Sequence, residues 1–141
     1  MKGIELMKAI VVEGDQTLVW KEVPAPALGP KEVAITVKAT AINRADLMQR
    51  RGLYPPPPGA SSVLGLECAG IVSAVGDETV RFKVGDAVCA LLPGGGYAEQ
   101  VAVDEGSVVP VPDGFDFVQA AALPEVYATA WLNLFIEAEL Q

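Results

Sequence analysis

The segment LGLECAGIVSAVG, residues 64–76, has the composition of a β-strand bounded by glycines. Small and β-branched residues fill it, and Gly70 lies in its middle. Glycine inside a strand indicates a bend or the close approach of another backbone. Glu67 is the one charged residue in this apolar run, and a carboxylate there requires a partner or a cavity. The sequence leaves open whether Glu67 is a catalytic base or pairs with an arginine.

Further strand patterns lie on both sides of this segment, separated by Gly and Pro turns. They cover residues 8–14, 17–23, 33–43, 84–92 and 95–103. The alternation in the third of them places Val33, Ile35, Val37 and Ala39 on one face. Short strands at spacings of about 8–12 residues are typical of a barrel or a sandwich. The sequence PGGG at 93–96 precedes a strand and not a helix, so we predict a turn there, not a phosphate-binding loop.

The pattern becomes helical near the end of the chain, at residues 115–123 and 127–140. The second of these helices carries apolar side chains on more than one face, among them Trp131, Leu134 and Phe135. A helix that is apolar nearly all round is normally buried on several sides. We therefore expect this chain to be a segment of a larger protein, or to bury the helix in an oligomer.

Composition excludes several classes of function. The chain has 141 residues, 51% of them hydrophobic, which predicts one globular domain. A net charge of −8 argues against nucleic acid or an anionic membrane surface as partner. No segment reads as a secretory signal or as a membrane span.

Cysteine and histidine usage narrows the chemistry. The two cysteines, Cys68 and Cys89, exclude a disulfide framework and favour the cytoplasm. They have no C-x-x-C spacing, and the chain has no histidine, the commonest general base and metal ligand. A zinc site or an activated thiolate is therefore not expected.

The segment NRADLMQRRGLYPPPPGA, residues 43–60, combines a short helix at about 45–51 with a proline arm that carries Tyr54. Consecutive prolines fix the backbone and remove donors, which makes a stiff loop. Binding groups are often found on loops that a scaffold holds in place.

Six segments together resemble the quinone oxidoreductase branch of the medium-chain dehydrogenase/reductase superfamily, most closely its tumour-suppressor-inducible members. They are NRADLMQRRGLY, PPPPGAS, LGLECAGIVSAVG, VGDAV, LLPGGGYAEQV and AAALPEVYATAW, in this order from about Met7 to the end. The resemblance implies a mainly β fold, a GroES-like, partly open β-barrel that forms the catalytic domain at 7–124. Residues 1–6 would be an N-terminal extension. Residues 125–141 would be a connecting helix toward a Rossmann domain that binds NADPH and that is missing from these 141 residues.

The resemblance also implies a function: hydride or electron transfer from NADPH to a quinone, without a metal. Asn43, Asp46 and Tyr54 would be the catalytic residues, and Asn43 and Thr129 would bind the cofactor. Tyr54 would stack on the flat substrate. Asn43 and Asp46 are equally suited to capping the helix that they begin.

Zinc-dependent members of the superfamily carry ligands at the positions of Asn43 and Leu66 and near Glu125. An amide, an aliphatic side chain and a single carboxylate do not make the three-ligand site that catalytic zinc requires. The resemblance therefore implies the zinc-free branch.

Other functions stay open. The chain could be a stand-alone GroES-like binding module without activity, or part of an enoyl or alkenal reductase. A zinc alcohol dehydrogenase is disfavoured by the missing ligands. The expected partner is a small-molecule quinone, and self-association through the apolar C-terminal helix is a further option. The 141-residue chain alone is expected to be inactive.

Overall fold

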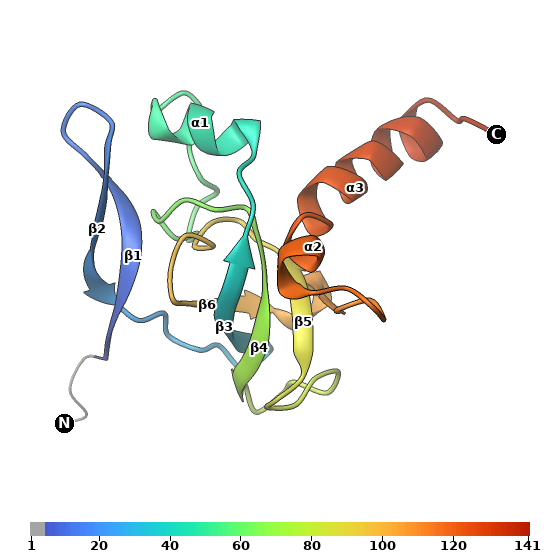
Figure 1. Ribbon diagram of the computed structural model, residues 1–141, viewed down its shortest axis with the longest axis horizontal. Helices are drawn as coiled ribbons and strands as arrows, with labels where there is room; N and C mark the ends of the chain where they lie inside the picture. Colours follow the sequence, from blue (N-terminus) through green and yellow to red (C-terminus); the bar gives the residue numbers. More distant parts are fainter. Residues whose placement is uncertain (1–4) are drawn as a thin grey trace.

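The computed structural model describes residues 5–141, which form a β-hairpin, a five-stranded sheet and C-terminal helices (Figure 1). The strands are β1 (Leu6–Glu13), β2 (Thr17–Pro24), β3 (Glu32–Thr40), β4 (Glu67–Val75), β5 (Ala87–Leu91), β6 (Gln100–Asp104) and β7 (Val108–Pro110). The helices are α1 (Arg44–Arg50), the 3-10 turn η1 (Glu105–Ser107), α2 (Phe117–Ala121), α3 (Pro124–Trp131) and the π-helical η2 (Leu132–Glu137). Of the expected extension at 1–6, residues 1–4 lie outside the described part, and Leu6 already belongs to β1.

The main sheet is antiparallel, with strand order β6-β3-β4-β5-β7. The β1–β2 hairpin is joined to it by a bridge between Ala9 and Ala98 and by Ile10 N, which donates to Tyr97 O at 2.8 Å. The two sheets do not close on each other. The mainly β, partly open GroES-like barrel predicted from the sequence is confirmed.

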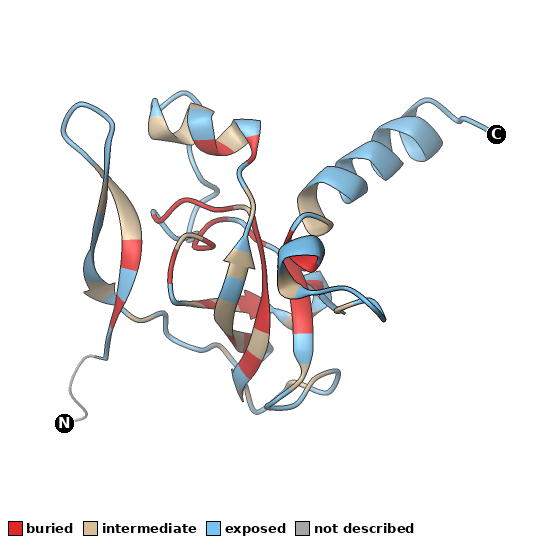
Figure 2. Cartoon of the chain, in the orientation of Figure 1, coloured by how far each residue is buried: buried red, intermediate tan, exposed pale blue. Residues whose placement is uncertain are grey.

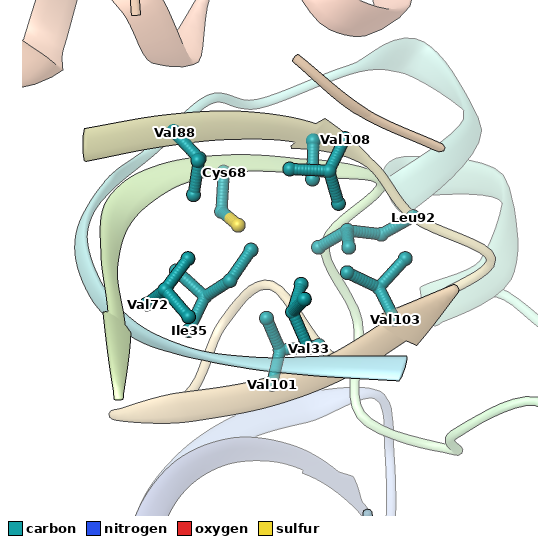
Figure 3. Packing of buried hydrophobic residues seen from close by; sticks show 10 residues of the cluster. Val33, Ile35, Cys68, Val72, Val88, Leu92, Val101, Val103 and Val108 are labelled. Atoms are coloured by element: carbon teal, nitrogen blue, oxygen red, sulfur yellow. The ribbon is translucent and has the colours of Figure 1, made fainter. Parts of the chain in front are cut away.

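The core lies inside the curl of the five-stranded sheet (Figure 3). It consists of small, mostly β-branched side chains: Val33, Ile35, Cys68, Val72, Val88, Ala90, Leu92, Val101, Val103 and Val108. β-Branched residues pack well on a pleated, half-buried surface, which is why these segments form strands.

The prediction that Ala39 shares one face of β3 with Val33, Ile35 and Val37 is wrong. Val33, Ile35 and Val37 pack in or against the core, but Ala39 packs on the other side of the sheet. Val37 pairs with Gly70 and Ala39 pairs with Ala69, so Lys38 is an extra residue in β3. A bulge of this kind shifts the alternation by one residue and turns Ala39 to the opposite face.

The structure explains the glycines that the sequence singled out, Gly70 and the PGGG turn at 93–96. A Cβ on Gly70 would lie 2.1 Å from Thr36 O, so β3 and β4 approach closely only because this residue is glycine. In the PGGG turn, Gly95 has a φ of +96°, a conformation that favours glycine. The amides of Gly95, Gly96 and Tyr97 donate to carbonyls of residues 63–65. The predicted turn is confirmed, and the amides of these three residues donate within the chain.

The C-terminal helices differ from the prediction in bounds and in burial. α3 begins at Pro124, three residues before the predicted start, because proline is well suited to the first turn of a helix. From Val126 onward α3 and η2 are exposed along their whole length (Figure 2). Trp131 is 61% exposed and contacts Phe135, with ring centroids 4.4 Å apart. The burial expected for this helix is therefore not provided by residues 5–141. None of the described helices is long and apolar enough to cross a membrane.

Candidate functional site

Asp46 fixes the start of α1 to the barrel. Its Oδ2 accepts hydrogen bonds from Asn43 N at 2.8 Å and from the Tyr97 hydroxyl at 2.9 Å. Its Oδ1 accepts from Gly65 N at 3.2 Å, and the residue is only 2% exposed. Asn43 is the N-cap of α1 and forms a capping box with Asp46. The capping roles considered from the sequence are thus confirmed, and a catalytic role for Asp46 stays a prediction.

Glu67 connects two helices to β4. It is fully buried, and its Oε1 accepts from Asn43 Nδ2 at 2.8 Å. Its Oε2 accepts from Glu125 N, at the start of α3, at 2.9 Å. Within residues 5–141 Glu67 forms no ion pair, so the arginine partner considered from the sequence is wrong. The carboxylate is held by a neutral amide and a backbone N–H, and it brings Asn43 close to the start of α3.

Tyr54 lies at a cavity of about 200 Å³. The cavity is lined by Gln49, Tyr54, Pro57, Leu66, Leu91, Leu92, Pro93 and Glu125. Sites for drug-sized ligands occupy about 300–1,000 Å³, so this volume suits a single ring. We call it the Tyr54 cavity. Apolar walls with a few polar groups are typical of a site for a small organic molecule.

Thr129 lies one turn beyond Glu125 on α3. Its hydroxyl donates to Glu125 Oε1 at 3.5 Å, a long hydrogen bond at the exposed surface. Thr129 does not line the Tyr54 cavity, but it bonds Glu125, which does. Asn43 does not line the cavity either, and Glu67 joins its side chain to the backbone of Glu125. Sequence reasoning did not select Glu125 as a site residue. The available signal was its place near the third metal-ligand position of zinc-dependent members.

Three larger cavities lie elsewhere, and none of them contains a predicted site residue. One of about 490 Å³ separates the β1–β2 hairpin from the loop at 59–63, and Glu32 is its one charged residue. The Glu32 carboxylate already accepts from Gly29 N at 2.7 Å. A second, of about 440 Å³, is lined by Glu32, Asp104 and the segment 91–93, among others. The third, of about 430 Å³, lies beside Trp20 and is mainly apolar, with Lys38 as its charged residue.

The buried thiols are not poised for reaction. Burial, with help from Cys89 and Glu67, raises the pKa of Cys68 to about 12. Burial and Glu67 also raise the pKa of Cys89. The two side chains pack on opposite faces of the β4–β5 pair, in different clusters, and both thiols are free. A nucleophilic thiolate needs a lowered pKa, so the cysteines are structural.

The positions that carry metal ligands in zinc-dependent members of the superfamily lie together in this chain, but the side chains present there do not form a metal site. Leu66 and Glu125 line the Tyr54 cavity, and the Asn43 amide is bonded to Glu67. In the described part of the chain no group of three or more His, Cys, Asp or Glu side chains could hold a metal ion.

Burial and the hydrogen bond to Asp46 raise the pKa of Tyr97, so its hydroxyl stays a donor.

Comparison with protein families finds one match. The alcohol dehydrogenase GroES-like domain matches residues 29–113. Among curated proteins, the synaptic vesicle membrane protein VAT-1 homolog of Danio rerio is 44% identical over 110 residues, covering 78% of this chain and 23% of that protein. A quinone oxidoreductase of Pseudomonas aeruginosa is 45% identical over 111 residues, covering 78% of this chain and 34% of that protein.

Solved structures agree with the fold. The crystal structure of the human VAT-1 homolog-like protein is 36% identical, with a TM-score of 0.88, and the match covers 97% of this chain and 45% of that one. The crystal structure of the CurK enoyl reductase is 29% identical, with a TM-score of 0.83 over 96% of this chain and 44% of that one. The chain therefore spans less than half the length of the proteins that it matches.

Proposed function

Because the chain belongs to the alcohol dehydrogenase GroES-like domain family, in the quinone oxidoreductase branch of the medium-chain dehydrogenase/reductase superfamily, we propose that it is the catalytic domain of an NADPH-dependent quinone reductase. The Tyr54 cavity carries this proposal. It has the size of one ring, is walled by aliphatic side chains and prolines, and lies beside the Asn43–Glu67–Glu125 hydrogen bonds. A fold alone does not define a reaction, so the chemistry depends on the groups at this cavity.

The proposed roles follow from the position of each side chain. The Tyr54 ring, half exposed at the cavity, stacks on the quinone ring, and its hydroxyl offers a hydrogen bond. The exposed Thr129 hydroxyl suits a carboxamide, so Thr129 and the nearby Asn43 would hold the nicotinamide. Asp46 acts indirectly, because it fixes the N-terminus of α1 and thereby Asn43. Bound NADPH would supply the hydride, and the protein supplies position.

A metal is not needed for this reaction. A quinone is electron-poor and accepts hydride without a Lewis acid, and water can supply the proton to the product. The aliphatic Leu66 and the internally bonded Asn43 support a metal-free site. Free, buried cysteines support a reducing compartment, the cytoplasm. We propose no nucleic-acid or membrane partner, and the exposed apolar face of α3 and η2 would be covered by another copy or another domain.

An enoyl reductase is the second candidate, because the CurK enoyl reductase has the same fold over nearly the whole chain. Both reactions deliver hydride to a carbonyl-conjugated acceptor. They differ in the acceptor shape: a flat ring suits stacking on Tyr54, whereas a thioester-linked enoyl chain is linear.

The experiment is steady-state oxidation of NADPH by the full product of the gene that encodes this chain. Quinones and enoyl thioesters are compared as acceptors. With an aromatic quinone, Tyr54→Ala is expected to lower kcat/KM at least about tenfold, which corresponds to about 1.4 kcal/mol of lost stacking and hydrogen bonding. The melting temperature should stay unchanged because Tyr54 is half exposed.

Two controls sharpen the assay. Trp20→Ala removes a half-exposed aromatic side chain of β2 that does not line the Tyr54 cavity and should leave kcat/KM unchanged. Tyr54→Phe separates ring stacking from the hydroxyl. The proposal fails if enoyl thioesters, and not quinones, are reduced. It also fails if a chelator removes a bound metal from the protein and the activity is lost with it.

A further inference from the structure

Glu67 is a buried carboxylate without a cationic partner. It is 0% exposed, and within residues 5–141 it forms no ion pair. Both of its oxygens accept hydrogen bonds, Oε1 from Asn43 Nδ2 at 2.8 Å and Oε2 from Glu125 N at 2.9 Å. This is the pattern of the ionised form, because a protonated carboxyl donates through one of its oxygens. A charge in the interior costs free energy unless it is paired, and residues 5–141 provide no cation for it.

A second buried carboxylate adds to the negative charge around Asn43. Asp46 is 2% exposed and accepts hydrogen bonds from neutral donors, among them Asn43 N and the Tyr97 hydroxyl. It forms no ion pair in the part of the chain that the structure describes. Burial and Asp46 raise the pKa of Tyr97, and the charge of Glu67 raises it further. The interior around Asn43 therefore has a negative potential.

Glu67 lies between the two residues that are proposed to hold the nicotinamide. One oxygen bonds the Asn43 side chain, and the other bonds the start of α3 at Glu125. The Thr129 hydroxyl, one turn further along α3, donates to Glu125 Oε1 at 3.5 Å. An amide and a hydroxyl suit the hydrogen-bonding groups of a carboxamide. A nicotinamide ring held by Asn43 and Thr129 would therefore have the Glu67 carboxylate as a near neighbour.

We propose that Glu67 favours hydride donation by stabilising the positive charge of the oxidised nicotinamide ring. This inference rests on the proposed quinone reduction. Hydride transfer moves two electrons and one proton from the neutral ring of NADPH to the quinone and leaves the cationic ring of NADP⁺, and water supplies the second proton of the hydroquinone. A fixed charge stabilises an opposite charge best where water is excluded. Glu67 acts through its field and through Asn43, so it is a positioning residue and not a catalytic one.

The hydrogen bonds of Glu67 are a separate, structural role. A carboxylate can accept from Asn43 Nδ2 and from Glu125 N at once, whereas an amide has one acceptor oxygen. Loss of these bonds would displace Asn43 and Thr129 for both forms of the cofactor alike. Loss of the charge would weaken the binding of the cationic form alone. The two roles therefore differ in what they do to the ratio of the two affinities.

The test is isothermal titration of the full gene product with NADPH and with NADP⁺. The two forms share the pyrophosphate and the adenosine, so the ratio of their dissociation constants reports on the ring. In Glu67→Gln the Kd of NADP⁺ should rise about tenfold relative to that of NADPH, because one nearby negative charge is removed. Glu67→Asp keeps the charge on a shorter side chain and should retain the wild-type ratio. Glu22→Gln removes an exposed charge of β2 and should also leave the ratio unchanged.

A measurement on the wild type does not depend on the folding of a variant. The ¹³C NMR shift of the Glu67 side-chain carboxyl distinguishes the ionised from the protonated form, and we expect the ionised form at about pH 7. A protonated Glu67 would contradict the inference, because a neutral group does not stabilise a cation.

Each result of the titrations has a defined meaning. If Glu67→Gln weakens NADPH and NADP⁺ equally, Glu67 only holds the helices, and the inference is wrong while the proposed quinone reduction stands. If Glu67→Asp changes the ratio as much as Glu67→Gln does, the charge is not the cause and the inference is wrong. If the full gene product binds neither form of the cofactor, the proposed function and the inference both fail.

Discussion

A single side chain, Glu67, determines how two helices meet the barrel. Its two oxygens are each used by a different helix, the first by the N-cap of α1 and the second by the start of α3. Because the carboxylate is fully buried, both bonds form away from competing water. Asn43 and Glu125 are therefore placed beside each other by a residue that does not itself line the Tyr54 cavity.

Glu67→Leu should destabilise the chain by about 2–4 kcal/mol, because it leaves the Asn43 amide and Glu125 N without an acceptor. Urea denaturation measures the loss, and hydrogen exchange of the Glu125 amide should become faster. Glu22→Leu, which replaces an exposed glutamate of β2, is the control and should change stability little. An equal effect of the two substitutions would mean that the Glu67 bonds do not hold the helices.

Cys68 makes stability depend on alkaline pH. Its pKa is raised from 9.0 to about 12 in the folded chain. The stabilisation is complete below the unfolded pKa of 9.0 and is lost as the pH rises toward the folded value, at about 1.4 kcal/mol per pH unit. Cys89, whose pKa is also raised, contributes in the same direction.

The measurement is the free energy of unfolding of the wild type and of Cys68→Ala from about pH 8 to about pH 11. The variant should be less stable at the lower pH, because a buried side chain is shortened. Its stability should then fall less steeply with pH. Parallel curves would show that the folded thiol titrates normally.

At the scale of elements, the closeness of β3 and β4 depends on Gly70. A Cβ there would overlap Thr36 O, which is backbone and cannot move aside without separating the strands. Gly70→Ala should therefore cost about 3 kcal/mol or more, at the upper end of overpacking effects. Gly52→Ala is the comparison, since its Cβ would meet nothing and only its φ of +70° is unfavourable, worth about 1 kcal/mol. Thermal denaturation of both variants measures the two losses of stability. Losses of similar size would mean that the close approach of β3 and β4 does not require Gly70.

Elements that depend on local pattern could be predicted from the sequence, and those that depend on distant contacts could not. The alternating segments became β1 to β6, and residues 45–51 became α1 with a shift of one residue. The side of Ala39 was missed because a bulge appears only when β4 pairs with β3. β7 was missed because it has three residues and includes a proline.

The site shows the same division. The helix-capping roles of Asn43 and Asp46 could be predicted because a helix start has a local signature. The hydrogen bond that Glu125 N donates to Glu67 Oε2 joins residues 58 positions apart in the sequence, so no local pattern predicts it. Tyr54 was predicted by resemblance, but its partner in the cavity, Glu125, was not.

At the scale of the whole molecule, the described residues present one side of a site. Tyr54, Glu125 and Thr129 lie at or beside one small cavity, and α3 with η2 extends away from the barrel with its apolar side chains uncovered (Figure 1). A hydride transfer requires donor and acceptor to be held at a fixed distance, and a displacement of about 1 Å can cost a hundredfold in rate. Residues on one side of a ligand cannot provide that restraint.

The 141-residue chain alone should accordingly not bind NADPH in the micromolar range. Nowhere in its sequence does a G-x-G-x-x-G turn occur, and the amides of Gly95 and Gly96 in the PGGG turn already donate to backbone carbonyls. The pyrophosphate would then lack donors, and Thr129 alone would supply little affinity. Isothermal titration of NADPH into the chain, with the full gene product as the positive control, measures this. Micromolar binding to the chain would mean that the barrel has a nucleotide site of its own. Absence of binding to both proteins would favour a binding module without oxidoreductase activity.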